Sequence, residues 1–576
     1  MSPSRALVWL SWLLALWWLA ACQGPLPVRV ADEASVDAAR FAGALAMPDR
    51  FSADAAQAVL NAGGNAVDAG IAAAFVLAVT LPEAGNLGGG GFLLAHVDGE
   101  AAFLDYRETA PAAAHRDVYL DQTGAVIDGA SLVGHRAAGV PGTVAGLWAA
   151  HQRWGTRPWA ELVAPAVALA GDGFEVPPGL AANITDEAAG FRGRTNFDAY
   201  FGAATAGSRW RQPELAATLA RIRDRGPEDF YRGETARLLA DDMAANGGLI
   251  TLADLAAYRV VWRAPLTARW RSYDVVTAPP PSSGGFGVIQ LLGMKAALDP
   301  LFAGAPVNST RYVHLVAEMQ KRVFADRDEY LGDADFVDVP TAALIADDYI
   351  ARRAAEVDAN AISNLDAAEP GLAEGLHTTH FSIVDRHGNA VSNTYTLNTS
   401  FGSGVVVPGA GFLLNNEMDD FSAKPGVPNV YGVIGNEANA IAPGKRPLSS
   451  MSPTLLLEND RVRMAVGTPG GSTIFGSVFL TIAAIVDGSL DPASALALPR
   501  FHHQLLPPDL ITFTPSRPLP ETTVAGLQRL GYRVEPHAWE FGDVQVVWRD
   551  DGGWQAASDP RHRGSARVLT AGKDTP

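Results

Sequence analysis

The apolar positions of the chain first predict two adjacent helices. Ser52 can cap a helix over Ala53 to Ala62, and Asn65 can cap a second helix over Ala66 to Val79, because both side chains accept hydrogen bonds from the free N–H groups of a helix start. The second helix is apolar on every side, so we expect it to be buried. It is too short for a membrane span, and it carries Asp68.

Farther along the chain, a group of strand patterns is followed by a long series of helical patterns and then by more strand patterns. Two strands, over Phe92 to Val97 and Ala102 to Tyr106, surround an Asp-Gly turn and place Arg107 at a strand end. Helical patterns dominate the next part of the chain, and strands return at Thr378. This order of strands, helices and strands predicts a layered α/β sandwich. The helical patterns cover Thr143 to Trp154, Trp159 to Ala170, Leu215 to Ile222, Thr235 to Asn246 and Ser309 to Ala325.

The strand pattern that begins at Thr378 predicts a β-hairpin. Its arms, Thr378 to Val384 and Ala390 to Asn398, are rich in Thr, Val, Ile, Phe and Tyr, and an Asp-x-x-Gly-Asn turn separates them. A hairpin centred on His387 places Thr378 opposite Thr396, with Cβ atoms roughly 5 Å apart. A slip of one or two residues is the alternative register. Threonine is also common in strands, so the hairpin alone does not identify a site.

Composition indicates a large, compact protein. The chain has 576 residues without an internal repeat or a long polar linker, which favours one large unit or two interlocked halves. Hydrophobic residues make up 48% and charged residues only 18%, which predicts an ample core. The formal net charge of −18, without clusters of Lys or Arg, argues against nucleic acid or an anionic membrane surface as a partner.

The first 22 residues have the features of a bacterial lipoprotein signal. Arg5 precedes an apolar run from Ala6 to Ala21, which ends in Leu-Ala-Ala before Cys22. We therefore expect a signal peptide over residues 1–21, acylation of Cys22, and a tether over residues 22–40. The alternative is an ordinary cleaved signal peptide that happens to contain a cysteine. Since Cys22 is the only cysteine, no disulfide can form within the chain.

Several short motifs occur along the chain in a fixed order. In that order they resemble the γ-glutamyltranspeptidase family of N-terminal-nucleophile hydrolases, from about Ala42 to about Leu569. Each motif is weak alone, whereas their joint order is a specific signal. The motifs are Gly85 to Phe92, Asp105 to Glu108, Pro141 to Gly146, Pro279 to Gly285, Thr378 to His380, Leu413 to Phe421, Arg446 to Thr454 and Gly467 to Ser472.

The resemblance implies a four-layer αββα sandwich that cleaves itself between His377 and Thr378. The family cuts this bond by an N-to-O acyl shift and hydrolysis, which would divide the chain into residues 41–377 and 378–576. A threonine hydroxyl is a poor nucleophile without a base, and a chain-terminal threonine carries its own base in the α-amine, whose pKa is roughly 7.7–8.0. Thr396 would hydrogen-bond Thr378 and tune its reactivity.

The resemblance also implies an oxyanion hole at Gly470 and Gly471. Glycine lets the backbone approach a substrate closely, and the helical pattern from Ser472 onward begins with unpaired N–H groups. A plain glycine turn before a helix is the alternative. Losing one oxyanion donor typically costs about 3–4 kcal/mol of transition-state stabilisation.

A γ-glutamyl donor carries an α-carboxylate and an α-ammonium, and the family-like residues can hold both. Arg107 can bind the carboxylate through two parallel hydrogen bonds. The candidate donors for the carboxylate are Ser449 and Ser450, and the candidate acceptors for the ammonium are Asn398, Glu417 and Asp420. Tyr431 matches a lid over the pocket.

Other chemistries have less support in the sequence. The histidine pairs His377/His380 and His502/His503 lack the carboxylate or cysteine partners of a zinc site, so no metal is predicted. The glycines from Gly88 to Gly91 run into a strand and lack the Lys-Ser/Thr of a phosphate loop. There is no Gly-x-Ser-x-Gly elbow either. No cofactor is predicted.

The sequence therefore predicts a self-cleaving γ-glutamyltransferase and glutathione hydrolase of the bacterial cell envelope or periplasm. Its expected partners are glutathione-like donors and amino acid or dipeptide acceptors, and its two chains would form a heterodimer attached to the membrane only through a lipid. The first alternative is an acylase that removes glutaryl side chains from β-lactams with the same nucleophile. The second is an inactive envelope scaffold, in which Thr378 would not be processed.

Overall fold

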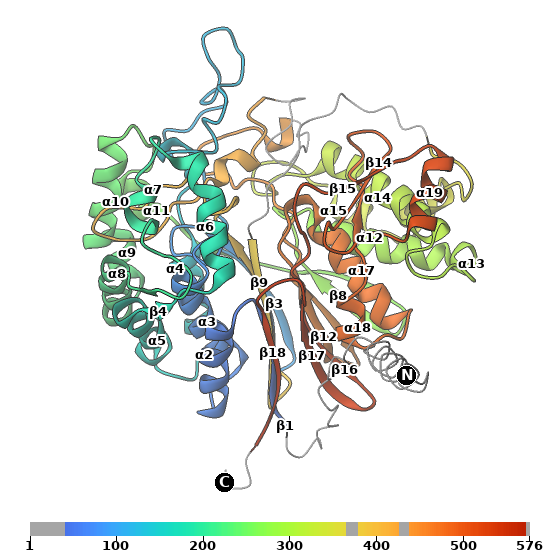
Figure 1. Cartoon of the computed structure of the whole chain (residues 1–576), viewed down its shortest axis with the longest axis horizontal. Helices are drawn as coiled ribbons and strands as arrows, with labels where there is room; N and C mark the ends of the chain where they lie inside the picture. The colour runs from blue at the N-terminus through green and yellow to red at the C-terminus, as the bar shows by residue number, and fades with distance from the viewer. Residues whose placement is uncertain (1–40, 364–377, 425–436, 572–576) are drawn as a thin grey trace, which may run out of the picture.

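Two β-sheets lie face to face, and helices cover the outer side of each (Figure 1). The computed structural model describes residues 41–363, 378–424 and 437–571. The predicted four-layer αββα sandwich is confirmed. The predictions for Cys22, His377 and Tyr431 lie outside the described residues.

The first sheet has seven strands, and the predicted hairpin occupies its centre. Its arms β9 and β10 are the third and fourth strands of the sheet, so both have neighbours on both sides. Thr378 is the first residue of β9. In spatial order the strands are β18 (Ser565–Thr570), β1 (Phe41–Met47), β9 (Thr378–Asp385), β10 (Ala390–Thr396), β2 (Gly90–Val97), β3 (Glu100–Asp105) and β6 (Val261–Arg263).

The second sheet has six strands, all joined by antiparallel pairing. Apolar side chains from both sheets fill the space between them, including Phe92 of the first sheet and Leu456 of the second. In spatial order the strands are β17 (Gly553–Ser558), β16 (Gln545–Asp550), β12 (Arg461–Gly467), β11 (Thr454–Glu458), β8 (Tyr273–Thr277) and β7 (Leu266–Trp270). Short strands β4 (Phe174–Glu175) with β5 (Arg209–Trp210), and β13 (Phe501–His502) with β14 (Leu510–Phe513) and β15 (Arg533–Pro536), form two small additional sheets.

The helices of the first outer layer pack on the first sheet through α2, α3 and α4, and α3 contacts the central strands β9 and β10. Every residue of α3 is buried, as its apolar composition predicts. The helices of this layer are α2 (Arg50–Asn61), α3 (Ala66–Thr80), α4 (Thr143–Trp154), α5 (Trp159–Asp172), α6 (Pro178–Phe191), α7 (Phe197–Phe201), α8 (Pro213–Arg225), α9 (Pro227–Arg232), α10 (Glu234–Ala245) and α11 (Leu252–Ala257).

The second outer layer covers the second sheet, with α12 against β7 and β8 and α17 against β12. Among the described residues, no helix combines the length and apolar composition that a membrane crossing requires. The helices of this layer are α12 (Gly284–Ala297), α13 (Asp299–Phe302), α14 (Thr310–Tyr330), α15 (Thr341–Leu344), α16 (Asp347–Ala355), α17 (Ile474–Val486), α18 (Pro492–Leu496) and α19 (Glu521–Leu530).

Helix capping confirms one prediction and corrects another. Asn65 caps α3 in a reciprocal box with Asp68, as the sequence suggests. Ser52 does not cap α2, so that prediction is wrong. Asp49 is the cap, and its carboxylate accepts from the Ser52 N–H at 2.7 Å and from the Ser52 hydroxyl at 2.7 Å. A carboxylate accepts these bonds more strongly than a hydroxyl does, which places the helix start three residues earlier.

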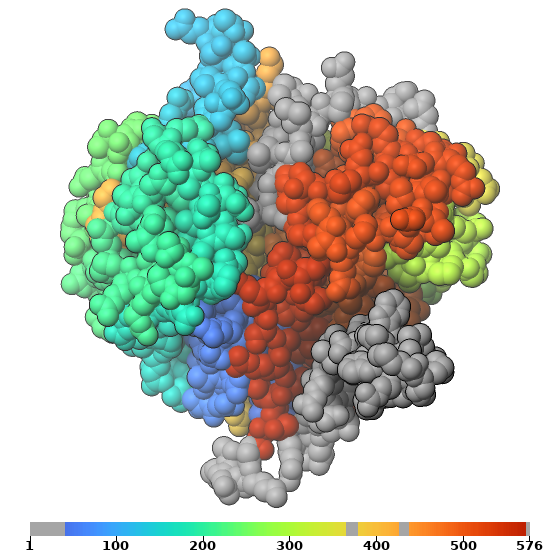
Figure 2. Space-filling model, viewed as in Figure 1, coloured from blue at the N-terminus to red at the C-terminus, as the bar shows by residue number. Residues whose placement is uncertain are grey.

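The space-filling view shows the two outer layers as separate masses on either side of the sheets (Figure 2). A loop that contains the Leu120–Val126 bridge projects from the first of them. Its Val126 and Ile127 are exposed.

Candidate active site

The β9–β10 hairpin has the predicted register. Thr378 pairs with Thr396 across the two strands, and their Oγ1 atoms are 3.2 Å apart, which is hydrogen-bonding distance. The alternative of a slipped register is excluded. Seven paired positions between the strands, together with β1 and β2 on their outer sides, fix this alignment.

Alternation along β9 directs Thr378 into the space between the two sheets. Residues two apart in a strand face the same side, and His380 and Ser382 contact the second sheet at Gly467 and at the Gln545 carbonyl. Burial lowers the pKa of His380 to about 3. It is therefore a neutral partner of the Thr394 hydroxyl, at 2.8 Å.

The Thr396 side of the pair is held by backbone and amide contacts. The Asn398 N–H donates to Thr396 Oγ1 at 2.8 Å, and Asn86 Nδ2 donates to the Thr396 carbonyl at 2.8 Å. The backbone of Gly89 passes so close that a Cβ there would lie 2.0 Å from the same carbonyl. The glycine motif thus gives close packing around the threonine pair.

Most of the predicted donor-site residues lie around one small cavity beside Thr378. The cavity encloses about 20 Å³, roughly the room for a single water molecule. Gly471 is part of its wall, whereas Gly470 is not. Arg327 of α14 also contributes and was not predicted, because the helical pattern in the sequence ends at Ala325 and nothing marks Arg327 as facing a site. The predicted residues in the wall are Arg107, Thr378, Thr396, Asn398, Glu417, Asp420, Ser449, Ser450 and Gly471.

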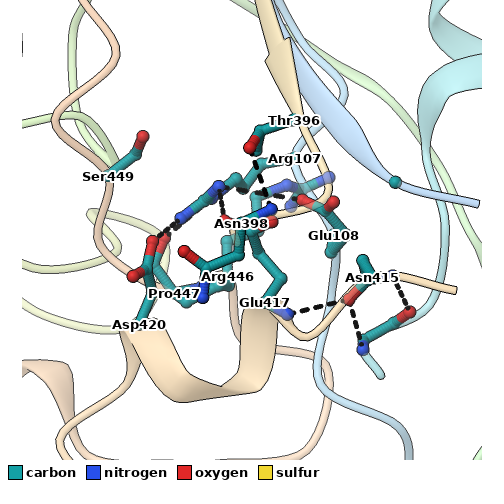
Figure 3. Close-up of polar contacts among 12 residues, drawn as sticks. Arg107, Glu108, Thr396, Asn398, Asn415, Glu417, Asp420, Arg446, Pro447 and Ser449 are labelled. Carbon is teal, nitrogen blue, oxygen red and sulfur yellow. Dashed lines mark hydrogen bonds and ion pairs between the residues drawn. The ribbon is translucent and has the colours of Figure 1, made fainter. Parts of the chain in front are cut away.

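Arg107 is part of the wall of this cavity and is itself fully buried. Its Nη1 pairs with Glu417 and its Nη2 with Asp420, and the Pro447 and Leu448 carbonyls accept from it at 3.3 Å. Figure 3 shows the guanidinium between Asp420 on one side and Glu108 on the other. The residues expected to hold opposite ends of a zwitterion therefore neutralise one another.

The carboxyl groups around Arg107 are strongly influenced by burial. Burial raises the pKa of Glu417 and of Asp420, and the positive charge of Arg107 opposes both shifts. Glu108 was missed by the sequence analysis as a site residue. It follows Arg107 directly, and only the fold shows that the end of β3 turns both side chains toward the same interior.

The Ser449–Ser450 segment is positioned by the Pro279 to Gly285 motif. The Ser449 N–H donates to the Pro281 carbonyl at 2.8 Å, and the Ser283 N–H and hydroxyl donate to the Ser449 carbonyl at 2.7 and 2.9 Å. Arg327 Nε donates to the Ser283 hydroxyl at 3.3 Å. Two motifs that are distant in the sequence thus form one wall of the cavity.

Gly470 and Gly471 form the turn before α17. Their φ angles are 135° and 53°, in the region that favours glycine, and a short 3₁₀ turn over Gly471–Thr473 precedes the helix. The helix therefore begins at Ile474, two residues later than the pattern from Ser472 suggests. The Thr473 N–H and hydroxyl both donate to the Gly470 carbonyl.

A second cavity reaches Thr378 from another direction and encloses about 570 Å³. Buried polar atoms without a partner among the described residues belong to its walls: Glu83 Oε2, Trp539 Nε1, Glu540 Oε2 and Arg563 Nη1. Thr378 thus lies in the walls of both a small charged pocket and a larger cavity. No group of three or more potential metal ligands occurs within residues 41–363, 378–424 and 437–571.

Comparisons with known proteins agree with the motif order. The family model described as Gamma-glutamyltranspeptidase matches residues 52–569. A glutathione hydrolase proenzyme of Pseudomonas aeruginosa is 53% identical over 542 residues, which are 94% of this chain and 97% of that protein. A glutathione hydrolase proenzyme of Escherichia coli is 43% identical over 542 residues, 92% of each chain.

A structural comparison finds the same architecture in an acylase. The crystal structure of a cephalosporin acylase from Bacillus halodurans has a TM-score of 0.80 and 26% identity, and the match covers 96% of this chain and 99% of that one. Sequence identity is thus about twice as high to the Pseudomonas aeruginosa glutathione hydrolase as to this acylase.

Proposed function

The chain belongs to the γ-glutamyltranspeptidase family, and we propose that it is a self-processing γ-glutamyltransferase and glutathione hydrolase with Thr378 as its nucleophile. The observation that carries the proposal is the Thr378–Thr396 hydroxyl pair at the edge of a cavity that also holds Arg107, Glu417 and Asp420. The proposed nucleophile thus lies beside charged side chains that can bind the α-carboxylate and the α-ammonium of a γ-glutamyl donor.

Maturation begins with attack of the Thr378 hydroxyl oxygen on the His377 carbonyl carbon. The C–N bond breaks as the ester forms, and water then hydrolyses the ester, which leaves Thr378 with a free α-amine. Thr396 supports this step by its hydrogen bond to the Thr378 hydroxyl. Gly471, in the wall of the same cavity, supports the assignment of Gly470 and Gly471 to the oxyanion hole.

In the mature enzyme the α-amine takes the proton of the Thr378 hydroxyl as that oxygen attacks the γ-carbonyl of the donor. The amine then passes the proton to the departing nitrogen, which leaves a γ-glutamyl ester on Thr378. Water or an acceptor amine breaks this ester. Arg107 binds the donor α-carboxylate with help from Ser449 and Ser450, while Glu417, Asp420 and Asn398 bind the ammonium. Tyr431 serves as a lid residue.

The two proposed chains, residues 41–377 and 378–576, remain together because the first sheet interleaves them. After cleavage the larger chain supplies β1, β2, β3 and β6, and the smaller supplies β9, β10 and β18. β1 lies between β18 and β9, so separation would break strand pairs on both of its sides. A heterodimer is the expected product.

One assay tests the proposed function. Purified mature protein is incubated with γ-glutamyl-p-nitroanilide, with and without glycylglycine, and p-nitroaniline release is followed. We expect release in both cases and faster release with the acceptor. A processed protein that releases none would contradict the proposal, and an uncut chain would favour the inactive scaffold.

Arg563 tests whether the acceptor enters through the larger cavity. Its Nη2 pairs with Glu83 while Nη1 has no partner among the described residues, so it can bind an acceptor carboxylate. A charge-assisted hydrogen bond contributes about 1.5–3 kcal/mol, so Arg563→Met is expected to raise the KM for glycylglycine about tenfold to a hundredfold. Hydrolysis without acceptor should stay within about twofold, because water needs no carboxylate contact.

Arg567→Met is the matched control for Arg563→Met. Arg567 bonds Gln57 and Asp54 and is not part of the cavity wall. Equal KM values for glycylglycine in the two variants would show that the acceptor does not use Arg563.

We propose that an acyl group on Cys22 anchors the protein to the cell envelope on its periplasmic side. Cys22→Ser is expected to remove the acylation site, and either release active enzyme into the soluble periplasmic fraction or block processing of the signal peptide. Mass spectrometry of the mature N-terminus decides the matter. An unmodified terminus downstream of Cys22 would identify an ordinary signal peptide.

A further inference from the structure

Asn439 joins two segments of the small cavity beside Thr378 that lie apart in the sequence. It ends the short 3₁₀ helix η5 (Glu437–Asn439), and its side chain is buried. Its Nδ2 donates to the Asp420 carbonyl at 2.7 Å, and its Oδ1 accepts from the Leu448 N–H at 3.0 Å. One amide group thus connects the acidic turn, residues 417–420, to the serine segment, residues 448–450.

Arg107 connects the same two segments through different atoms. Its Nη2 pairs with the Asp420 carboxylate (Figure 3). The same Nη2 donates to the Leu448 carbonyl at 3.3 Å. Asp420 and Leu448 are therefore each bonded to both Arg107 and Asn439, and the four residues form a closed ring. Arg107 is part of the cavity wall, whereas Asn439 lies outside it.

A γ-glutamyl donor must open this ring on the side of Arg107. The α-carboxylate of the donor competes with Asp420 for the guanidinium, and the α-ammonium competes with the guanidinium for Asp420. The Arg107–Asp420 contact is then exchanged for contacts to the donor. The Asn439 amide bonds only backbone atoms of Asp420 and Leu448, so the charges of the donor leave both of its bonds intact.

The Asn439 side chain matches both backbone groups, and its own backbone is fixed. A carbonyl needs a donor and an N–H needs an acceptor, and an amide offers one of each. Lys445 Nζ donates to the Ala438 and Ala440 carbonyls at 2.6 and 2.9 Å, on either side of Asn439. The Ser422 N–H donates to the Asn439 carbonyl at 2.9 Å. The amide is therefore held in place independently of its two side-chain bonds.

We propose that Asn439 is a positioning residue, which keeps the acidic turn and the serine segment at a fixed separation while a donor is bound. The donor α-carboxylate binds on the side of Arg107 and the serine segment, and the α-ammonium binds at Asp420. This separation therefore decides whether one donor reaches both at once. The inference rests on the proposed γ-glutamyl specificity and adds to it a residue that does not touch the donor.

The test compares Asn439→Leu and Asn439→Asp with the wild type as mature two-chain enzymes. Leucine has nearly the shape of asparagine but forms neither bond. Aspartate keeps an acceptor for the Leu448 N–H but cannot donate to the Asp420 carbonyl. The KM and kcat for γ-glutamyl-p-nitroanilide are measured, and denaturing gels check that each variant is processed.

The expected result is a change in KM and not in kcat. The α-carboxylate and the α-ammonium keep their charges through the reaction, so they contribute equally to binding the donor and the transition state. We expect KM to rise about tenfold or more in Asn439→Leu and about fivefold or more in Asn439→Asp, with kcat within about threefold of the wild type.

Asn196→Leu is the matched control. Asn196 Nδ2 donates to the Val406 carbonyl at 2.7 Å, and its Oδ1 accepts from the Val406 N–H at 3.0 Å, so the same two kinds of bond occur at the same distances. Neither residue lines the two cavities at Thr378. The control is expected to lower the Tm but to leave the donor KM within about twofold of the wild type.

Glutaryl-p-nitroanilide separates positioning from a merely structural role. It has no α-ammonium and cannot use both segments at once. Its kcat/KM, or its Ki where it acts only as a competitive inhibitor, should therefore change by less than about threefold in Asn439→Leu. An equal loss for both compounds would mean that the whole pocket is distorted, and would overturn the inference.

The KM values decide the remaining outcomes. A KM within about twofold of the wild type in Asn439→Asp, or a fall in kcat at unchanged KM, overturns the positioning role. Asn439→Asp decides this even where Asn439→Leu does not fold. Failure of the proposed function would look different, because the processed wild type would then release no p-nitroaniline.

Discussion

Thr378→Ala is expected to give a single uncut chain without transferase activity. The variant lacks the oxygen that attacks the His377 carbonyl, and so the α-amine that would serve as base is never released. Loss of a nucleophile that acts as a unit with its base typically lowers kcat by about 10⁴-fold or more. Denaturing gels and p-nitroaniline release measure the two effects. Wild type should show two chains, the smaller from Thr378 to Pro576.

Thr379→Val is the matched control for this experiment. Thr379 is the next residue of β9 and is also buried, but it pairs with Tyr395 and not with Thr396, and its hydroxyl has no partner among the described residues. We expect normal cleavage. An active, uncleaved Thr378→Ala enzyme would refute the mechanism, since no other residue is proposed to supply both nucleophile and amine.

The hairpin could be predicted from sequence because its register depends on local features. A turn of fixed length and two strand arms align Thr378 with Thr396 without any information from the rest of the chain. The burial of α3 follows equally from its composition. The four-layer arrangement needed the family resemblance, since periodicity shows which segments are strands but not which sheet they join.

What the sequence could not show depends on long-range packing. Asp49 and Ser52 are both good caps, and only the structure shows that Asp49 is the cap, with its other oxygen accepting from Thr80 at 2.6 Å. In the sequence, Glu108 resembles one member of a surface ion pair. The structure shows that it lies buried just beyond the end of β3. The mutual pairing of Arg107, Glu417 and Asp420 joins residues more than 300 positions apart.

Asp420→Asn separates γ-glutamyl specificity from the glutaryl acylase alternative. A glutaryl group keeps a distal carboxylate for Arg107 but has no α-ammonium, so it gains nothing from Asp420. For a γ-glutamyl donor the substitution removes a charge partner in a largely desolvated site. The expected loss is about 2–4 kcal/mol of transition-state stabilisation, read from kcat/KM with γ-glutamyl-p-nitroanilide. Self-cleavage should survive, because Asp420 has no part in it.

The structure adds a second expectation for the glutaryl compound. Asp420 pairs with Arg107 Nη2, and a glutaryl carboxylate must compete with that contact. In Asp420→Asn the competing charge is gone, so kcat/KM for glutaryl-p-nitroanilide should stay constant or rise while that for the γ-glutamyl compound falls. The ratio of the two values is therefore the measurement, and it is insensitive to the amount of active enzyme.

Asp419→Asn is the control for charge and for stability. Asp419 is adjacent and buried, but it accepts from the Ser131 hydroxyl at 2.5 Å and does not line the donor cavity. Its substitution should leave the donor ratio unchanged. A wild-type preference for the glutaryl compound, or an Asp420→Asn ratio equal to that of Asp419→Asn, would mean that no ammonium is bound at Asp420. The acylase assignment would then replace the transpeptidase one, because Arg107 and Thr378 serve both reactions equally well.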